Sequence, residues 1–320
     1  MRVLVTGGSG YIGSHVVRLL AERGDTPIIV DDFATGLPER VSGHVKYALD
    51  LASREGPDHL ASIMRSDEVD SVIHFAALKR VDESVRHPLL YMRRNLVGIA
   101  TVLEAMRLAQ VRDLVFSSSA AVYGDARGVV PESAATLPVN AYGYSKLAGE
   151  WLAAATARAE GLRVVSLRYF NVAGTGWPEL ADVAVLNLVP MVLEKLERGE
   201  GPLIFGDDYP TADGTCVRDF VHVLDVARAH LSVVDSMPVH GAPHRVYNVG
   251  TGKGTSVRDV VEGIRRRIND APAAVIRERR PGDAPEVVAD VGLISSELGW
   301  QAQYGIDEIL DSACRAHSSR

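Results

Sequence analysis

The fold is decided by the N-terminal stretch MRVLVTGGSGYIGSHVVRLLAERG, residues 1–24. Its apolar, β-branched run at 3–5 predicts a buried strand, and the amphipathic segment 11–23 predicts a helix. The turn that joins them carries three glycines, Gly7, Gly10 and Gly13. The first turn of a helix leaves backbone N–H groups that can bind a phosphate where no Cβ blocks the approach. The glycines therefore indicate either phosphate binding or a tight turn with close helix–sheet packing.

The second predicted strand favours the phosphate-binding interpretation. Residues 28–30 form an apolar run that ends in Asp31, roughly 20 residues beyond the turn. An acidic side chain at this place can accept hydrogen bonds from an adenosine ribose, and it would repel a 2′-phosphate. We therefore expect a dinucleotide site that takes NAD rather than NADP. The glycine spacing GxxGxxG resembles that of the short-chain dehydrogenase/reductase superfamily.

Composition excludes several classes of protein. The 320 residues are 47% hydrophobic, which suffices for a large core, and the formal net charge of −7 disfavours nucleic-acid binding. No apolar run reaches the ~18 residues of a membrane span, and no basic-then-apolar leader precedes the first strand. The two cysteines, Cys216 and Cys314, show no metal-ligand spacing. We expect a cytoplasmic protein without a metal, a membrane or a nucleic acid as partner.

Strand-like and helical patterns alternate through the first half of the chain. The expected strands are 26–31, 45–49, 71–75, 112–117 and 163–169. This alternation predicts a Rossmann-type, doubly wound parallel sheet of the α/β class. We expect residues 1–171 to form this domain, with later segments at about 216–250 returning to it. Residues 172–320, rich in Gly and Pro, are expected to form mainly a smaller α/β substrate domain.

A second glycine-rich segment, YNVGTGKGTSVRDVV at 247–261, is interpreted as structural. It carries Gly250, Gly252 and Gly254 before a predicted helix, but no acidic residue follows a further strand at the required distance. Ser256 is expected to cap the helix.

Tyr142 and Lys146 are the first candidates for chemistry. They are four residues apart at the start of a predicted helix, so both side chains lie on one face. A lysine cation near a tyrosine lowers the pKa of the phenol and makes it a usable base, although this spacing is also common in surface pairs. Ser119 lies where a buried strand ends, which places it either at a simple cap or in the ligand crevice of a doubly wound sheet.

Together these features resemble the extended branch of the short-chain dehydrogenase/reductase superfamily, and within it the UDP-glucose 4-epimerase family over essentially the whole chain. The similar stretches are VTGGSGYIGSH, HFAALKRVDESVRHPL, FSSSAAVYGD, AYGYSKL, LRYFNVAG, IFGDDYPTADGTCVRDFVHV and RPGDAPEVVAD. The resemblance implies Tyr142 as the base, Ser119 as its partner on the C4 hydroxyl of the sugar, and Lys146 as the third catalytic residue.

The resemblance also implies a set of NAD-binding residues. Asp31 would hold the adenosine ribose, Asp50 and Leu51 would flank the adenine, and Phe170 would back the nicotinamide. Lys79 and Lys146 would contact the nicotinamide half. The full implied set is Gly7, Gly10, Tyr11, Ile12, Gly13, Asp31, Asp32, Asp50, Leu51, Phe75, Ala76, Ala77, Lys79, Asn95, Ser117, Tyr142, Lys146, Tyr169 and Phe170.

The implied substrate is a UDP-sugar. Arg218 and Arg280 would pair with its diphosphate, and Asp283 with its uridine ribose. The implied substrate set is Lys79, Ser119, Tyr142, Asn171, Asn187, Phe205, Arg218, Arg280, Asp283 and Val287. The segment 174–190, GTGWPELADVAVLNLVP, is shorter and more apolar than in many epimerases, which puts the role of Asn187 in doubt.

The implied reaction is oxidation at C4 of the sugar to a 4-keto intermediate, followed by return of hydride to the opposite face. Nucleotide-sugar dehydratases and decarboxylases resemble these enzymes but carry an acid after the serine or threonine, where this chain has Ala120 and Ala121. A non-catalytic NAD-sensing regulator is the alternative of another class, and it would be expected to lose Tyr142 or Lys146.

The sequence leaves the sugar open. By resemblance, Val287 aligns with a position that gates the pocket at C2 of the hexose, and its small size would admit an N-acetyl group; it is equally a plausible inward-facing strand residue. Glucose, N-acetylhexosamine, uronate and pentose substrates all stay open. The resemblance suggests a homodimer through the helices near 85–108 and 143–160.

Overall fold

The computed structural model of the chain describes residues 1–237, 242–280 and 282–319. The chain divides into two compact units, each built from segments that are separate in sequence. The first unit comprises Met1–Gly124, Thr136–Tyr169 and Ala227–Tyr247. The second comprises Asp125–Ala135, Phe170–Val226 and Asn248–Arg320.

The first unit contains a seven-stranded sheet in the order β11-β7-β5-β4-β1-β2-β3. Its strands are β1 (Arg2–Thr6), β2 (Thr26–Asp31), β3 (Val45–Ala48), β4 (Ser71–His74), β5 (Asp113–Ser119), β7 (Arg163–Tyr169) and β11 (His244–Val249). The pairs β1–β2, β1–β4, β2–β3, β4–β5 and β5–β7 are parallel. The predicted fold class, a doubly wound parallel sheet, is confirmed.

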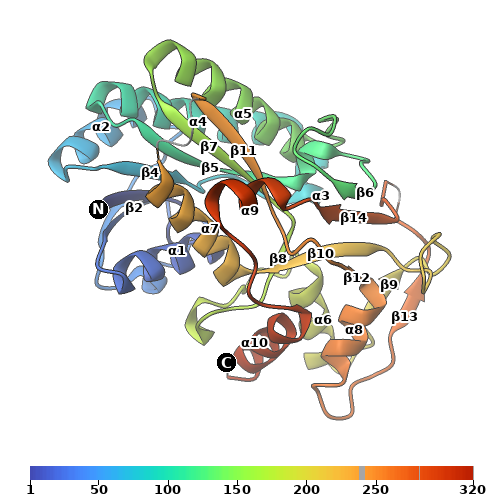
Figure 1. Cartoon of the computed structure of the whole chain (residues 1–320). Coiled ribbons are helices and arrows are strands. Elements are labelled where there is room, and N and C mark those ends of the chain that lie inside the picture. The colour runs from blue at the N-terminus through green and yellow to red at the C-terminus, as the bar shows by residue number, and fades with distance from the viewer. Residues whose placement is uncertain (238–241, 281, 320) are drawn as a thin grey trace. The chain divides into compact units, whose positions relative to one another are not determined.

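Helices cover both faces of this sheet, as Figure 1 shows. They are α1 (Tyr11–Glu22), α2 (Gly56–Ser66), α3 (Val81–Arg86), α4 (Pro88–Ala109) and α5 (Ala141–Glu160), with short 3-10 turns η1 (Pro38–Val41) and η2 (Ala120–Tyr123) and with α7 (Val223–Ser236), which begins in the second unit. α2, α4 and α5 pack on one face, where alternate strand residues such as Leu4, Val72 and Leu114 join their core. Residues of the opposite parity, such as Val5 and Ile29, are buried on the other face.

The strand order reverses between β1 and β4, because β2 and β3 lie to one side of β1 while β4, β5 and β7 lie to the other. In doubly wound sheets, ligands bind at such a point, outside the carboxyl ends of the strands. The glycine turn follows β1, Asp31 ends β2, Phe75 follows β4 and Ser119 ends β5. The fold therefore brings the ends of four strands that carry predicted site residues to one edge of the sheet.

The second unit contains a mixed sheet in the order β12-β10-β14-β6, with β8 also paired to β10, and a two-stranded sheet β13-β9. Its strands are β6 (Gly128–Val130), β8 (Asn171–Ala173), β9 (Leu203–Phe205), β10 (Val217–His222), β12 (Gly254–Ser256), β13 (Val275–Arg277) and β14 (Glu286–Ala289). Its helices are η3 (Pro178–Leu180), α6 (Leu188–Glu197), α8 (Val257–Arg265), α9 (Gly292–Leu298) and α10 (Ile306–Ser318). A core of apolar residues from α6, α8 and α10 packs with strands β8 to β10.

Two local predictions can be compared with the helices and strands of the structure. Ser256 does cap α8, since its hydroxyl accepts a hydrogen bond from the N–H of Asp259 at 3.0 Å. The strand predicted at 112–117 begins one residue later and ends two residues later than expected, at Ser119, because the serines continue the ladder with β7. Among the described residues, no helix is long and apolar enough to cross a membrane. A cytoplasmic location stays a prediction.

Candidate active site

The glycine turn after β1 has two kinds of glycine. Gly7 has a φ of +69°, and a Cβ on it would lie 2.7 Å from the backbone nitrogen of Ala76. A Cβ on Gly13 would lie 2.4 Å from the carbonyl oxygen of Gly7. The chain itself therefore requires these two glycines for its tight turn and its helix packing.

Gly10 is different, because within 4 Å its Cβ would meet only the carbonyl oxygen of Gly7, at 3.2 Å. Gly10 is the N-cap of α1, and no side chain caps this helix end. The missing Cβ thus leaves the backbone uncovered directly at a helix N-terminus. That is the place where a pyrophosphate can approach the backbone N–H groups and the positive end of the helix dipole.

Asp31 is buried beside the glycine turn. Its carboxylate accepts hydrogen bonds from the Ser9 hydroxyl at 2.5 Å, from the Ser9 N–H at 3.1 Å and from the Phe33 N–H at 2.9 Å. A carboxylate has about four acceptor positions, so one position stays available for a ribose hydroxyl. These hydrogen bonds fix the carboxylate next to the loop that would hold the phosphates.

Asp32 and Asp50 meet through a residue that sequence reasoning missed. Arg94 on α4 donates from Nη1 to the Asp50 carboxylate at 2.7 Å and from Nη2 to Asp32 at 3.1 Å. The hydrogen bonds from Arg94 and from the Ala52 N–H outweigh partial burial and lower the pKa of Asp50. Arg94 thus joins the ends of β2 and β3, where the adenine is expected.

The catalytic candidates lie together at the ends of β5 and the start of α5. Asn140 caps α5 by accepting a hydrogen bond from the Gly143 N–H at 2.9 Å, which places Tyr142 in the first helical turn. The Ser119 side chain is hydrogen-bonded to the Tyr142 hydroxyl. The Lys146 ammonium lies 5.9 Å from the centroid of the Tyr142 ring. The structure therefore brings all three predicted catalytic residues together.

The electrostatics of this group differ from the sequence-based expectation. Burial raises the pKa of the Tyr142 phenol, and the hydrogen bond from Ser119 opposes that effect. Burial also lowers the pKa of Lys146 to about 8, although Glu150 opposes it. The Lys146 ammonium donates to the Ser117 carbonyl oxygen at 2.7 Å rather than to the phenol. The lysine alone is therefore not what would make Tyr142 a base here, and additional positive charge is needed.

The loop after β4 carries four predicted residues, Phe75, Ala76, Ala77 and Lys79. Its three nonpolar members are half-buried and Lys79 is exposed. Asn95 holds this loop, because its side chain accepts from the Leu78 N–H at 2.8 Å and donates to the Leu78 carbonyl oxygen at 3.1 Å. Most of the Asn95 hydrogen-bonding capacity is thus used within the protein, which favours a positioning role.

The remaining predicted NAD-binding residues are aromatic or apolar side chains that are buried or half-buried. The Phe75 ring lies 4.7 Å from the ring of His230, whose Nε2 is 2.6 Å from the Tyr169 hydroxyl. Leu51 and Tyr11 are buried, and Ile12 is half-buried. Phe170 belongs to the second unit, where its N–H donates to the Val249 carbonyl oxygen at 3.0 Å.

The second unit brings most of the predicted UDP-binding residues together. Arg218 on β10 is 3.5 Å from the Asp283 carboxylate, and it pairs in register with Val287 on β14. The Arg280 guanidinium stacks 3.8 Å from the centroid of the Phe205 ring. Two cations, one carboxylate and an aromatic ring are suitable groups for a nucleoside diphosphate.

Asn171 and Asn187 are less clearly placed. Both side chains are exposed, and Asn187 donates to the Asp182 carboxylate at 3.3 Å. Asn187 is the N-cap residue of α6 but its side chain makes no capping hydrogen bond. A role in substrate binding stays a prediction for both residues.

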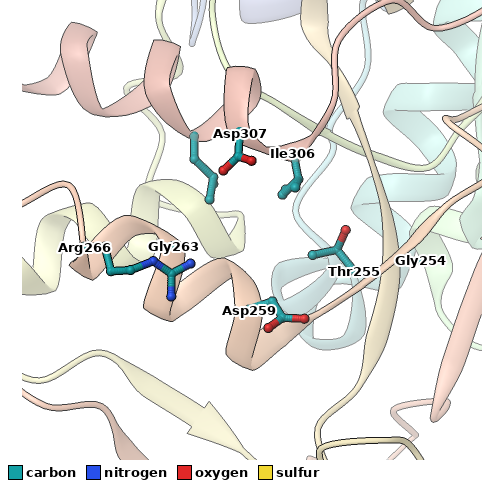
Figure 2. Close-up of a pocket in the computed structure, with 8 residues that line it drawn as sticks. Gly254, Thr255, Asp259, Gly263, Arg266, Ile306 and Asp307 are labelled. Carbon is teal, nitrogen blue, oxygen red and sulfur yellow. The ribbon is translucent and has the colours of Figure 1, made fainter.

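The second unit also contains a pocket of about 320 Å³, whose lining differs from the predicted site residues of that unit. Figure 2 shows its lining, with Asp259 from α8, Arg266 directly after that helix, and Ile306 and Asp307 from the start of α10. None of the predicted catalytic, NAD-binding or substrate-binding residues lines it, although Gly254 of the second glycine-rich segment does.

Comparisons with known proteins agree with this geometry. The profile of the NAD dependent epimerase/dehydratase family matches residues 3–250. A UDP-glucose 4-epimerase from Azospirillum brasilense is 41% identical over 319 residues, which cover 98% of this chain and 90% of that protein. The resemblance indicated by the motifs is thereby confirmed.

Two solved structures extend the comparison. UDP-glucose-4-epimerase from Stenotrophomonas maltophila, with bound NAD and formylated UDP-arabinopyranose, has a TM-score of 0.93 at 35% identity and covers 100% of this chain and 98% of its own. The UDP-Glc/GlcNAc 4-epimerase from Campylobacter jejuni has a TM-score of 0.86 at 30% identity and covers 100% and 99%.

Proposed function

Since this chain belongs to the NAD dependent epimerase/dehydratase family, we propose that it inverts C4 of a UDP-hexose with NAD as its resident cofactor. The observation that carries the proposal is the cluster of Ser119, Tyr142 and Lys146 at the carboxyl end of β5, on the sheet edge that also holds the glycine turn. UDP-glucose and UDP-galactose are the proposed pair, with the N-acetylhexosamine pair as additional substrates.

The residues of the first unit fit NAD. The uncovered backbone at Gly10 would take the pyrophosphate, Asp31 would accept from the adenosine ribose, and Asp50 would lie beside the adenine. Lys146 and Lys79 would contact the nicotinamide half. When bound, NAD supplies a hydride acceptor and the positive charge of its nicotinamide ring.

The residues of the chain move the proton. We assign Tyr142 as the general base that takes the proton of the C4 hydroxyl, with Ser119 donating to the phenolic oxygen and so stabilising the phenolate. Lys146, held by the Ser117 carbonyl oxygen, adds a fixed cation beside the phenol. Because Tyr142 then holds the proton, it can return it when the 4-keto sugar is reduced on its other face.

Recognition of UDP is assigned to the second unit. Arg218 and Arg280 would pair with the diphosphate, and Asp283 with the uridine ribose. With protein contacts concentrated on UDP, the sugar is free to rotate and to present its opposite face. Inversion at C4 then needs no second catalytic base.

Two alternatives are less well supported. A dehydratase or decarboxylase needs an acid to move a proton at C5 or C6, but η2 offers Ala120 and Ala121 directly after Ser119. A non-catalytic NAD sensor would have no use for the buried Lys146 or for a serine hydrogen-bonded to Tyr142.

The proposed reaction is tested with a panel of UDP-sugars. The purified protein is incubated with UDP-galactose, the N-acetylated pair, UDP-glucuronic acid and a UDP-pentose, and the products are identified by chromatography and NMR. We expect UDP-glucose from UDP-galactose without net release of NADH. Formation of a stable keto, deoxy or decarboxylated sugar would overturn the assignment, and so would the absence of any product.

The proposed NAD site can be tested by the identity of the bound cofactor and by a substitution at Gly10. Denaturing the purified protein is expected to release NAD and not NADP. Gly10→Ala is expected to lose about 10-fold or more in NAD affinity, because the new Cβ lies where the pyrophosphate approaches. The new Cβ also lies 3.2 Å from the Gly7 carbonyl oxygen, so the turn must shift by a few tenths of an ångström to accept it. Gly98→Ala is the control, since its Cβ lies no closer than 4.0 Å to Ala76. Equal NAD affinity of Gly10→Ala and the control, measured by titration, would contradict the site.

The proposed range of substrates can be tested at Val287. This residue is half-buried and pairs with Arg218 and Gly128 on neighbouring strands. We expect activity on the N-acetylhexosamine pair as well as on the unacetylated pair. Val287→Tyr is expected to reduce the ratio of kcat/KM for acetylated over unacetylated sugars by about 10-fold or more, because a larger side chain fills the space for the acetyl group. An unchanged ratio, or a wild type that ignores the acetylated sugars, would show that Val287 is not the gate.

We propose further that the protein is a homodimer joined through α4 and α5. These helices pack on each other and expose large apolar side chains, among them Leu89 at 83%, Trp151 at 64% and Tyr144 at 51% exposure. Trp151→Glu is expected to yield monomers in sedimentation velocity, because the charge would be buried at the interface. A wild type that sediments as a monomer would refute the dimer.

A further inference from the structure

Arg168 and Glu150 form a buried ion pair on the two elements β7 and α5, and the mechanism proposed above gives this pair no role. Arg168 on β7 donates to the Glu150 carboxylate from Nε at 2.9 Å and from Nη2 at 2.6 Å. The two side chains are only 6% and 3% exposed. Buried pairs of this kind are costly to form, and they add stability only when the remaining hydrogen-bonding groups are satisfied.

The surrounding groups satisfy this pair. The Ser118 hydroxyl donates to the Glu150 carboxylate, and Arg168 Nη1 donates to the Tyr123 hydroxyl at 2.9 Å. Ser118 and Arg168 are partners in the register of β5 and β7. The network therefore joins β5, η2, α5 and β7.

Two of these elements, β5 and α5, carry the catalytic residues. Ser118 lies between Ser117, which binds the Lys146 ammonium, and Ser119, which binds Tyr142. Glu150 lies one helical turn beyond Lys146 on α5. Close packing permits this reach, because a Cβ on Gly149 would lie 2.7 Å from the Phe116 ring on β5.

The charges around Lys146 show what Glu150 contributes. The titratable and charged groups that face this region from α5, β4, β7, β11 and η2 are Tyr142, Glu150, His74, Arg168, Tyr169, His244 and Tyr123. Burial lowers the pKa of His74 to about 3 and raises that of Tyr169, so both stay neutral at physiological pH. Glu150 is the anion of this set, and Arg168 is a fixed cation. Arg168 is bound to Glu150, one helical turn beyond Lys146, so without Glu150 the positive charge of Arg168 would be buried and uncompensated at that turn of α5.

We propose that Glu150 is a positioning residue for the reaction, which cancels the buried charge of Arg168 one helical turn beyond Lys146 and anchors Ser118, so that Lys146 stays an ammonium and Ser119 stays in place. The assignment rests on the proposed function, because it assumes that Tyr142 and Lys146 act as base and cation. A purely structural role would alter stability and kcat but would not move the pH range of activity.

The test is the pH profile of kcat for the holoenzyme and for four variants. Glu150→Gln keeps the shape and the Ser118 contact but removes the charge, so both limbs of the profile are expected to move to lower pH by about one unit. Glu150→Asp keeps the charge and is expected to keep the wild-type limbs. The double variant Glu150→Gln/Arg168→Met restores neutrality and is expected to return the limbs. Glu160→Gln, an exposed glutamate of the same helix, is the control.

A second readout does not depend on catalysis. Tyrosinate absorbance is measured against pH for wild type and for each variant, with and without the additional substitution Tyr142→Phe. The difference between the two curves reports the ionisation of Tyr142. This ionisation is expected at lower pH in Glu150→Gln than in wild type. The proposal would be overturned if both the pH profile of kcat and the tyrosinate titration of Glu150→Gln coincided with those of wild type. It would also be overturned if the limbs of the pH profile were shifted in the double variant. The double variant also provides the test if Glu150→Gln alone does not fold. Failure of wild type to epimerise any UDP-sugar would refute the proposed function, while the absorbance titration would still decide the role of Glu150.

Discussion

Replacing Tyr142 with phenylalanine is expected to lower kcat by about 10²-fold or more, with little change in the affinity for UDP. The substitution removes only the phenolic oxygen, which the Ser119 side chain contacts and which the account identifies as the base. UDP recognition is assigned to other residues, on β10 and in the 280–283 segment. The measurement is turnover of UDP-galactose together with calorimetric titration of UDP.

Tyr144 provides the matched control for this prediction. It lies on the same helix, but its side chain is 51% exposed and no catalytic role is assigned to it. Tyr144→Phe is expected to retain nearly normal turnover. Ser119→Ala is expected to lower kcat less than Tyr142→Phe, because Ser119 assists the base without taking the proton. Near-normal epimerisation by the Tyr142 variant would rule out this mechanism.

Replacing Arg168 with methionine is expected to lower the free energy of unfolding by about 3–5 kcal/mol. The substitution leaves the Glu150 carboxylate buried without its bidentate cation, and it leaves the Tyr123 hydroxyl without a partner from Arg168. The effect is measured by urea unfolding, followed by circular dichroism. The double variant Glu150→Gln/Arg168→Met is expected to regain most of the loss, because no charge is then buried alone.

Arg163→Met is the matched control on the same strand. Arg163 also pairs with a carboxylate, that of Asp113 on β5, but its side chain is 40% exposed. Solvent screens such a pair, so the expected loss is only about 0–1 kcal/mol. Equal losses for the Arg168 and Arg163 variants would show that the Glu150–Arg168 pair has no special weight in the stability of the fold.

The parts of the structure that depend on local sequence could be predicted. The apolar runs of β1 and β2 and the amphipathic pattern of α1 determine those elements, and the glycine turn lies between them because its backbone needs positive φ at Gly7. Tyr142 and Lys146 share a face because they are one turn apart on a helix. The parallel sheet then follows from the alternation of strands and helices.

The features that could not be predicted depend on which strands pair and on what is buried. The register that places Arg168 beside Ser118 is set by tertiary pairing of β5 with β7. Arg94 reaches Asp32 and Asp50 only because α4 packs near the ends of two strands. Burial likewise determines the pKa direction of Tyr142, for which helical spacing alone had indicated the opposite sign. The i,i+4 spacing from Lys146 to Glu150 was the one available signal for the buried network.

The most direct test of the central claim follows the hydrogen bound to C4. UDP-galactose that carries deuterium at C4 is converted in ordinary water, and the product is examined by NMR and mass spectrometry. If the hydrogen leaves C4 and returns to the opposite face of the same sugar, the UDP-glucose formed keeps all of its deuterium at C4, and no label enters the solvent. Loss of deuterium to water, or product in which C4 has kept its configuration while another carbon has exchanged, would contradict the account.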